Sequence, residues 1–91
     1  MATSHDLSLH KLRYVVAVAD TLGFRKAAER CHVSQPSLSQ QIQKLEEELG
    51  VTIFERRRNQ VVLTPLGEQL VHQAQRVLEE VDHIKLLAAQ G

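Results

Sequence analysis

The chain has 91 residues, of which 43% are hydrophobic and 3% aromatic, and its 11 basic side chains are balanced by 11 acidic ones. A chain of this length forms one small domain, whose aliphatic core is too small to enclose a catalytic-sized cleft. The charge is nevertheless unevenly spread, because basic residues outnumber acidic ones up to Leu63 and acidic residues outnumber basic ones after it.

Cysteine, histidine and hydropathy patterns exclude several further classes of protein. Cys31 is the single cysteine, which rules out an internal disulfide and favours a reducing compartment, and we expect it to be a small buried residue at a helix end. The histidines, at positions 5, 10, 32, 72 and 83, lack metal-ligand spacing. No stretch is long and apolar enough to span a membrane, and the N-terminus does not read as a signal peptide. We therefore predict a cytoplasmic protein without a metal, a cofactor or a membrane contact.

Two helices are predicted at the front of the chain. From Ser8 to Leu22 the apolar residues recur with helical spacing, and Gly23 ends the pattern. A second, shorter helix fits Phe24 to Cys31. Its two alanines, at positions 27 and 28, are small enough for another helix to cross closely.

The run from Ser34 to Gly50 predicts a third helix, whose two faces differ in chemistry. The apolar stripe recurs at spacings of four, three and four, and consists of Leu38, Ile42, Leu45 and Leu49. The opposite face is polar, without a carboxylate before Leu45, and carries Pro36, Ser37, Ser39, Gln40, Gln43 and Lys44. Ser34 is expected to be the N-cap and Gly50 to supply the C′ position.

The short connection between the second and third helices is typical of a helix-turn-helix. We expect a turn of about three residues, Cys31, His32 and Val33, without the glycine that is often found there. An acid-free, amide-rich helix face suits a surface that must approach phosphates and read base edges.

A short hairpin is predicted after Gly50. A β-branched run begins at Val51 and Ile53, a polar turn follows around residues 57–60, and a second β-branched run covers residues 61–63. Two strands alone are marginally stable, so this hairpin must lean on the helices. It is either the wing of a winged helix-turn-helix or a plain structural hairpin. Two basic clusters are compatible with phosphate contacts, although each alone is more often a solvated surface: Arg25, Lys26 and Arg30, and Arg56, Arg57 and Arg58.

The last part of the chain predicts one long helix. Thr64 and Pro65 provide an N-cap and a first-turn proline, and the pattern continues to Gln90, a length of about 39 Å. Because so small a domain cannot cover that length, we expect Leu66 and Leu70 to pack on the chain's own first helix and the rest of the stripe to meet another chain. The predicted dimerisation residues are Leu70, Ala74, Val77, Val81 and Ile84.

Several short motifs together carry a family resemblance. They are the paired alanines at 27 and 28, VSQPSLS at 33–39, QIQKLEEELG at 41–50, FER at 54–56 and LTPLG at 63–67. With these motifs the chain, from about Leu7 to Leu87, resembles the N-terminal DNA-binding domain of LysR-type transcriptional regulators. A further likeness of residues 25–39 to the peroxide-sensing branch of that family says little about the effector.

The resemblance implies a fold and an assembly. The fold would be mainly α, with a winged helix-turn-helix of three helices plus a β-hairpin wing over residues 1–63 and a linker helix for dimerisation over residues 64–91. The partners would be double-stranded DNA and a second copy, as a homodimer or a dimer of dimers. The effector-binding domain, through which a small-molecule or redox effector acts, would be absent from this chain.

The resemblance also implies residue roles. Gln35, Pro36, Ser37, Ser39 and Gln40 match positions that face the major groove, Arg56 matches a backbone-contacting arginine of the wing, and Thr64 matches a phosphate contact. From the polar face and the basic clusters we add Gln43 to base readout, and Arg25, Ser34, Lys44, Arg57 and Arg58 to phosphate and wing contacts. Position 40 is commonly arginine in this family, whereas the amide of Gln40 suits adenine rather than guanine.

Two other classes of function remain open at this point. A winged-helix module could bind protein instead of DNA through its polar helix face, and a salt titration of DNA binding separates these two functions. An enzyme would need a nucleophile with its base, a phosphate-cradling loop or a metal cluster. The serines at 34, 37 and 39 lie close in sequence to His32, but no third orienting group is indicated. We therefore predict that the chain is not an enzyme.

Overall fold

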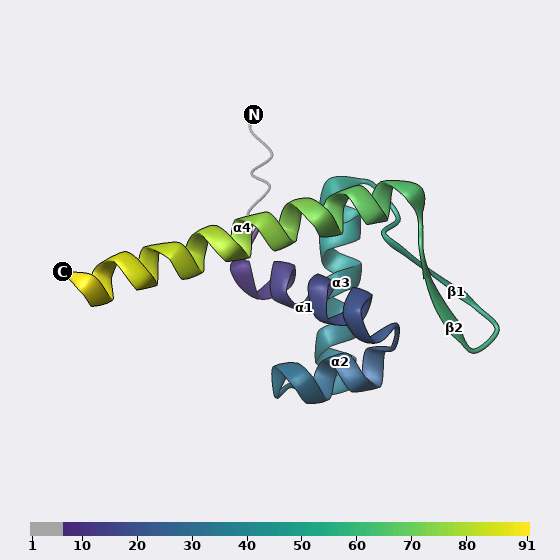
Figure 1. Cartoon of the computed structure of the whole chain (residues 1–91). Helices are drawn as coiled ribbons and strands as arrows, with labels where there is room; N and C mark the ends of the chain where they lie inside the picture. Colours follow the sequence, from purple (N-terminus) through teal and green to yellow (C-terminus); the bar gives the residue numbers. More distant parts are fainter. Residues whose placement is uncertain (1–6) are drawn as a thin grey trace.

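The computed structural model describes residues 7–91, which form four helices and a two-stranded hairpin (Figure 1). In chain order the elements are α1 (Leu9–Thr21), α2 (Phe24–Cys31), α3 (Gln35–Leu49), β1 (Phe54–Arg57), β2 (Gln60–Leu63) and α4 (Pro65–Gln90). This confirms the predicted mainly α, winged helix-turn-helix fold with a long last helix. The domain division at residues 63 and 64 stays a prediction, and its first six residues lie outside the described part. None of the described helices is long and apolar enough to cross a membrane.

The ends of α1 and α2 use left-handed residues that are not glycine. α1 ends at Thr21, and Leu22 takes a left-handed conformation (φ 53°) while its N–H donates to the Val18 carbonyl. Gly23, which we expected to end this helix, is instead extended and is the N-cap of α2. His32 (φ 59°) follows α2 in the same left-handed conformation, so the turn into α3 needs no glycine.

α3 carries the core stripe and the caps that its sequence predicts. The Ser34 hydroxyl accepts a hydrogen bond from the Ser37 N–H, and Gly50 caps the C-terminal end in a left-handed conformation (φ 69°). Its buried side chains are Leu38, Ile42 and Leu45. They join a single core to which α1 contributes Val15 and Val18 and α2 contributes Ala27 and Ala28. The opposite face of α3 is thereby left at the surface.

A part-buried ion pair ties α1 to the C-terminal part of α3. Lys11 is only 8% exposed, and its Nζ lies 3.0 Å from Oε1 of Glu48. A charge with so little contact with water needs a partner, and the Glu48 carboxylate is that partner for Lys11. No residue of the polar face of α3 takes part in it.

The hairpin starts later and turns more tightly than we predicted. Its antiparallel register pairs Phe54 with Leu63 and Arg57 with Gln60, so the turn is only residues 58–59. Arg57 and Gln60 therefore belong to the strands, and the β-branched residues at 51 and 53 precede β1. Arg58 allows this tight turn by adopting a positive φ of 55°. Phe54 is buried and anchors the first strand to the helices.

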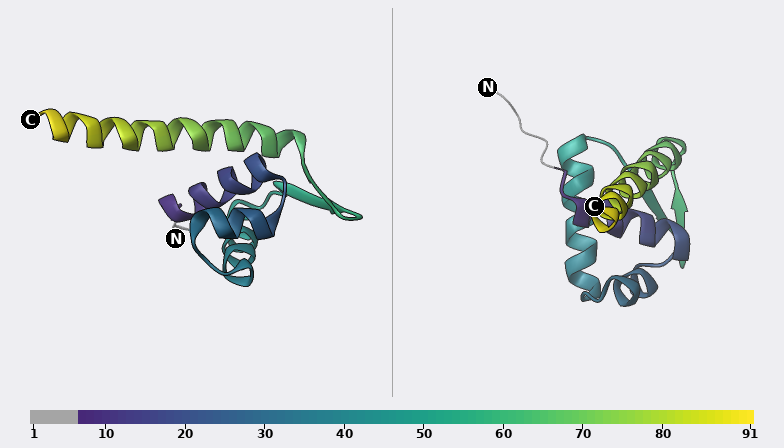
Figure 2. Two further views of the ribbon diagram at one scale, coloured as in Figure 1. Left: turned by 60° about the horizontal axis from the view of Figure 1, so that its bottom comes forward. Right: turned by 60° about the vertical axis from the view of Figure 1, so that its left-hand side comes forward.

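α4 packs on the domain with its first half and extends beyond it with its second half (Figures 1 and 2). The buried residues are Gly67, Val71 and Ala74, and none beyond Ala74 is buried. Leu66, which we expected to pack on α1, is 44% exposed, so that expectation was wrong. The packed stripe is shifted from Leu66 by one residue, about 100° around the helix, because Gly67 is the position that meets Ile53.

Candidate nucleic-acid interface

The polar face of α3 gathers most of the predicted base-reading residues on one exposed surface. Gln35, Pro36, Ser37, Gln40 and Gln43 are all exposed, as is the neighbouring Lys44. Ser39 is only half-buried, and it lines a hollow beside the hairpin. The surface is a ridge of amides and hydroxyls at the positive end of a helix dipole, which favours an approaching anion.

A second group of predicted residues surrounds a hollow of about 440 Å³ beside this ridge. The hollow is lined from three sides: the start of α2, the first turn of α3 and the tip of the hairpin. Its charged or amide-bearing lining residues include Arg25, Lys26, Gln35, Arg56 and Arg58. The fold therefore brings two residues of each basic cluster of the sequence to one concave surface, next to the first turn of the predicted reading helix. Lys26 is an exposed member of this surface that we did not include among the site residues.

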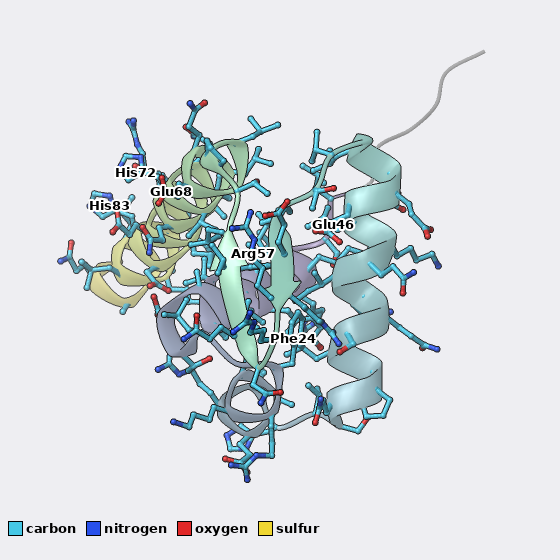
Figure 3. The ribbon with its side chains drawn as sticks, turned by 90° about the vertical axis from the view of Figure 1, so that its right-hand side faces the viewer. Phe24, Glu46, Arg57, Glu68, His72 and His83 are labelled. Atoms are coloured by element: carbon cyan, nitrogen blue, oxygen red, sulfur yellow. The ribbon has the colours of Figure 1, made fainter. Side chains whose placement is uncertain are left out.

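Arg56 is held by an aromatic ring. Its guanidinium carbon lies 4.2 Å from the centroid of the Phe24 ring, a cation–π geometry. The Phe24 ring in turn meets Phe54 edge to face, with centroids 6.1 Å apart. Figure 3 shows Phe24 between the hairpin and α3. Sequence reasoning missed Phe24 as a functional residue. The available signal was that the chain has two phenylalanines, one at the start of α2 and one next to the wing arginines.

The other basic residues of the two clusters differ in their partners. Arg25 lies 3.7 Å from a carboxylate oxygen of Glu29, and Arg57 lies 2.9 Å from one of Glu55. Both pairs are exposed, so each is worth only about 0–1 kcal/mol and can be exchanged for a phosphate contact. Because side chains alternate along a strand, Arg57 lies on the opposite face of β1 from Arg56. Arg30, by contrast, pairs with Asp20 at 3.0 Å and does not line the hollow of Arg56.

Thr64 has a structural role that competes with a phosphate contact. Its hydroxyl donates to the Thr52 carbonyl at 2.6 Å and accepts from the Gly67 N–H at 2.9 Å. Its backbone N–H donates to the carbonyl of Ile53. Both donors of this residue are thus used within the fold. A hydrogen bond to phosphate would need the hydroxyl to leave Thr52, and the phosphate contact of Thr64 stays a prediction.

The predicted dimerisation residues fall into three groups by exposure. Ala74 is 4% exposed because it lies on the side of α4 that packs on the domain of its own chain, so it cannot contribute much new buried area to a dimer. Leu70, Val77 and Val81 are half-buried. Ile84 is 66% exposed, on the part of α4 that extends past the domain. The stripe that remains open is therefore centred toward the C-terminal half of the helix.

A separate hollow, which Arg30 lines, lies between α1, α2 and α4. It is mostly apolar, encloses about 510 Å³ and is lined by residues that include Tyr14, Cys31 and Leu78. Burial raises the pKa of the Cys31 thiol, against the opposing effect of the nearby Arg30 and Arg13 guanidiniums. Cys31 is half-buried at the last position of α2, close to the expected environment. Within residues 7–91 no three histidine, cysteine or acidic side chains gather to hold a metal ion.

Comparison with known proteins places these features in a family. Residues 9–68 match the model of the bacterial regulatory helix-turn-helix proteins of the lysR family. Over 84 residues the chain is 50% identical to the DNA-binding transcriptional dual regulator OxyR of Escherichia coli, an alignment that covers 92% of this chain and 28% of that protein. The chain thus spans less than a third of this relative's length.

Solved structures agree with the sequence comparison. The fold superposes on full-length OxyR from Pseudomonas aeruginosa with a TM-score of 0.89 and 55% identity, covering 93% of this chain and 29% of that one. It superposes equally well, with a TM-score of 0.89 and 40% identity, on the BenM DBD in complex with catB site 1 DNA. In that case 92% of this chain and 94% of the other are covered.

Proposed function

This chain belongs to the lysR family of bacterial regulatory helix-turn-helix proteins, and we propose that it reads double-stranded DNA with α3 as the DNA-binding domain of a transcriptional regulator. One observation carries the proposal. Gln35, from the amide-rich face of α3, borders one concave basic surface together with Arg56 and Arg58 of the hairpin, and the residues that line this surface include no carboxylate. A DNA duplex presents phosphates beside base edges, and this surface offers cations beside amides.

The roles follow from the positions of the side chains. Gln35 and Gln40, exposed on the first turns of α3, would read base edges, since an amide can pair with adenine through two hydrogen bonds. Pro36, Ser37, Ser39 and Gln43 would border the same bases. Phosphates would be held by Arg25, Ser34, Lys44 and Arg56, with Arg58 at the hairpin tip along the adjacent minor groove.

Pairing of two copies through α4 would complete the reader. The exposed stripe of α4 is long, apolar and unsuited to water, and two copies related by a twofold axis would place two α3 helices on successive half-sites. The protein would act in the cytoplasm as a homodimer or a dimer of dimers, and not as an enzyme. Relatives are called hydrogen peroxide-inducible genes activators. We assign any response of this protein to a small molecule or an oxidant to a region outside these 91 residues.

Selection of bound sites from a random duplex library, followed by a salt titration, tests the proposal. The chain should enrich a defined sequence, and log affinity should fall linearly with log salt by about 0.9 per phosphate contact. On the selected site, Gln35→Ala and Gln40→Ala should each cost about 1 to 3 kcal/mol and relax preference at one position, while affinity for a scrambled duplex stays the same. Equal losses on both duplexes would refute base reading. If no sequence is enriched and binding is independent of salt, the polar face binds something other than DNA.

A further inference from the structure

The segment that joins α3 to the hairpin is hydrogen-bonded to a carboxylate of α3, the predicted reading helix. Oε2 of Glu46 accepts two hydrogen bonds, one from the N–H of Ile53 at 2.7 Å and one from the N–H of Phe54 at 3.1 Å. Both donors lie where the chain enters β1. A charged acceptor that satisfies two neighbouring backbone donors makes a strong and directional contact. Figure 3 shows Glu46 on the side of α3 that faces the hairpin.

A relay of contacts leads from this carboxylate to the wing arginine. Glu46 holds the backbone of Phe54, the Phe54 ring meets the Phe24 ring edge to face, and the Phe24 ring carries the Arg56 guanidinium. Glu46, Phe24, Phe54 and Arg56 all line one hollow of about 340 Å³ between α3 and the hairpin, together with Ser39 and Gln43. The predicted base-reading side of α3 and the wing arginine Arg56 therefore border the same group of contacts around Glu46, Phe24 and Phe54.

The opposite side of the same segment is also held. The Thr64 hydroxyl donates to the carbonyl of Thr52, and the Thr64 N–H donates to the carbonyl of Ile53. The approach of α4 is so close here that a Cβ at Gly67 would lie 2.3 Å from the Ile53 oxygen. The N–H groups of Ile53 and Phe54 are thus bound to α3, and the carbonyls of Thr52 and Ile53 are bound to Thr64, the N-cap of α4. A segment fixed on both sides leaves the hairpin little freedom to swing relative to α3.

We propose that Glu46 is a positioning residue for DNA binding, which holds the hairpin at the distance from α3 at which Arg56 contacts the phosphate backbone while α3 occupies the major groove. The proposal rests on the DNA-binding function proposed above. Two short exposed strands have little stability of their own, so the position of Arg56 depends on what anchors the base of the hairpin. Glu46 supplies that anchor from the element that reads the bases.

The decisive measurement is the slope of log affinity against log salt, on the duplex that the wild-type chain selects from a random library. Glu46→Ala should lower the magnitude of the slope by about one unit for each phosphate that the wing no longer touches, and leave the ranking of bases at each position unchanged. Glu46→Gln should keep a slope close to that of the wild type, because its amide oxygen can accept the same two hydrogen bonds. Glu47→Ala is the matched control, since Glu47 lies on the same helix outside this network of contacts and its removal makes the same change in charge.

A double-mutant cycle separates positioning from a general loss of stability. If Glu46 acts through Arg56, then Glu46→Ala should change the slope in the wild-type background and have no further effect in an Arg56→Ala background. A merely destabilised protein would lose affinity by the same factor at every salt concentration, with its slope unchanged. Circular dichroism shows whether Glu46→Ala folds. If it does not, Phe24→Leu removes the aromatic ring that contacts Arg56 and should lower the magnitude of the slope in the same way.

The outcomes distinguish this inference from the function on which it rests. A wild-type slope in Glu46→Ala, or in Phe24→Leu should that variant be needed, would overturn the positioning role while leaving DNA binding intact. A Glu46 effect that persists without Arg56 would also overturn it. A wild-type chain that shows no salt-dependent, sequence-selective DNA binding would overturn the proposed function itself, and the positioning role with it.

Discussion

Ile84 offers the sharpest test of pairing through α4. The side chain is 66% exposed, and a fully buried isoleucine contributes about 1.5–3 kcal/mol relative to an exposed one. Burying the exposed two-thirds in a dimer is therefore worth about 1–2 kcal/mol per copy. A twofold axis uses the residue twice, which gives about 2–4 kcal/mol per dimer. Ile84→Glu should forfeit at least this amount, so the dimer dissociation constant should rise roughly 30- to 700-fold.

The position of Ile84 makes the result easy to interpret. Ile84 is exposed and no residue of α4 beyond Ala74 is buried, so the substitution should leave the fold of each copy intact. The C-terminal half of α4 extends beyond the other helices (Figure 2). Val77 and Val81 are less suitable because both are half-buried within one copy. The matched control is His83→Glu, which places the same acid on an exposed neighbouring face of the helix (Figure 3).

The assay is analytical ultracentrifugation over a range of protein concentrations, with circular dichroism to confirm that the helical content is kept. Binding to a duplex with two half-sites should weaken much more than binding to a single half-site. The reasoning is refuted if Ile84→Glu forms dimers as tight as those of the His83→Glu control. A wild-type chain that stays monomeric at every concentration would refute it as well.

Three further predictions concern the hairpin, the start of α4 and the cysteine. Arg58→Ala should flatten the salt dependence of DNA binding by about one unit, and Arg57→Ala should flatten it less because Arg57 lies on the other face of β1 and pairs with Glu55; equal effects in the titration would refute this distinction. Gly67→Ala should lower the free energy of unfolding by about 1–3 kcal/mol in urea denaturation, because the new Cβ would force Ile53 and α4 apart, and an unchanged midpoint would count against that close approach. Burial raises the pKa of the Cys31 thiol, so the thiolate that alkylating agents require should form at a higher pH in the folded chain than in urea. Rates of iodoacetamide labelling against pH would show this shift, and coincident profiles would exclude it.

The local features of this protein could be predicted from its sequence because their causes lie within a few residues. The caps of α3 at Ser34 and Gly50, its buried stripe, and the span of α4 from Pro65 to Gln90 all follow from helical spacing and cap chemistry. The same spacing placed the polar face of α3 at the surface. Most of the candidate base-reading residues could therefore be named before any fold was known.

The tertiary structure decided what lies between the elements. Periodicity cannot indicate which side of a long apolar stripe meets the chain's own core. The structure shows that Gly67 approaches Ile53 closely, that Ala74, seven residues further along the same face, is buried, and that Leu66 is exposed. Nor can periodicity show that His32 and Arg58 would take left-handed conformations, since packing and pairing on either side of each turn impose them.

The contacts that position Arg56 were the part of the candidate site that was hardest to predict from the sequence. Phe24 and Arg56 lie far apart along the chain, and only the packing of α2 against β1 brings the ring under the guanidinium. Glu46 reads in the sequence as one of three solvated carboxylates at the end of a helix. It becomes an anchor because the chain after Gly50 returns along α3 with two N–H groups that no strand partner satisfies, and the nearest strong acceptor on α3 is this carboxylate.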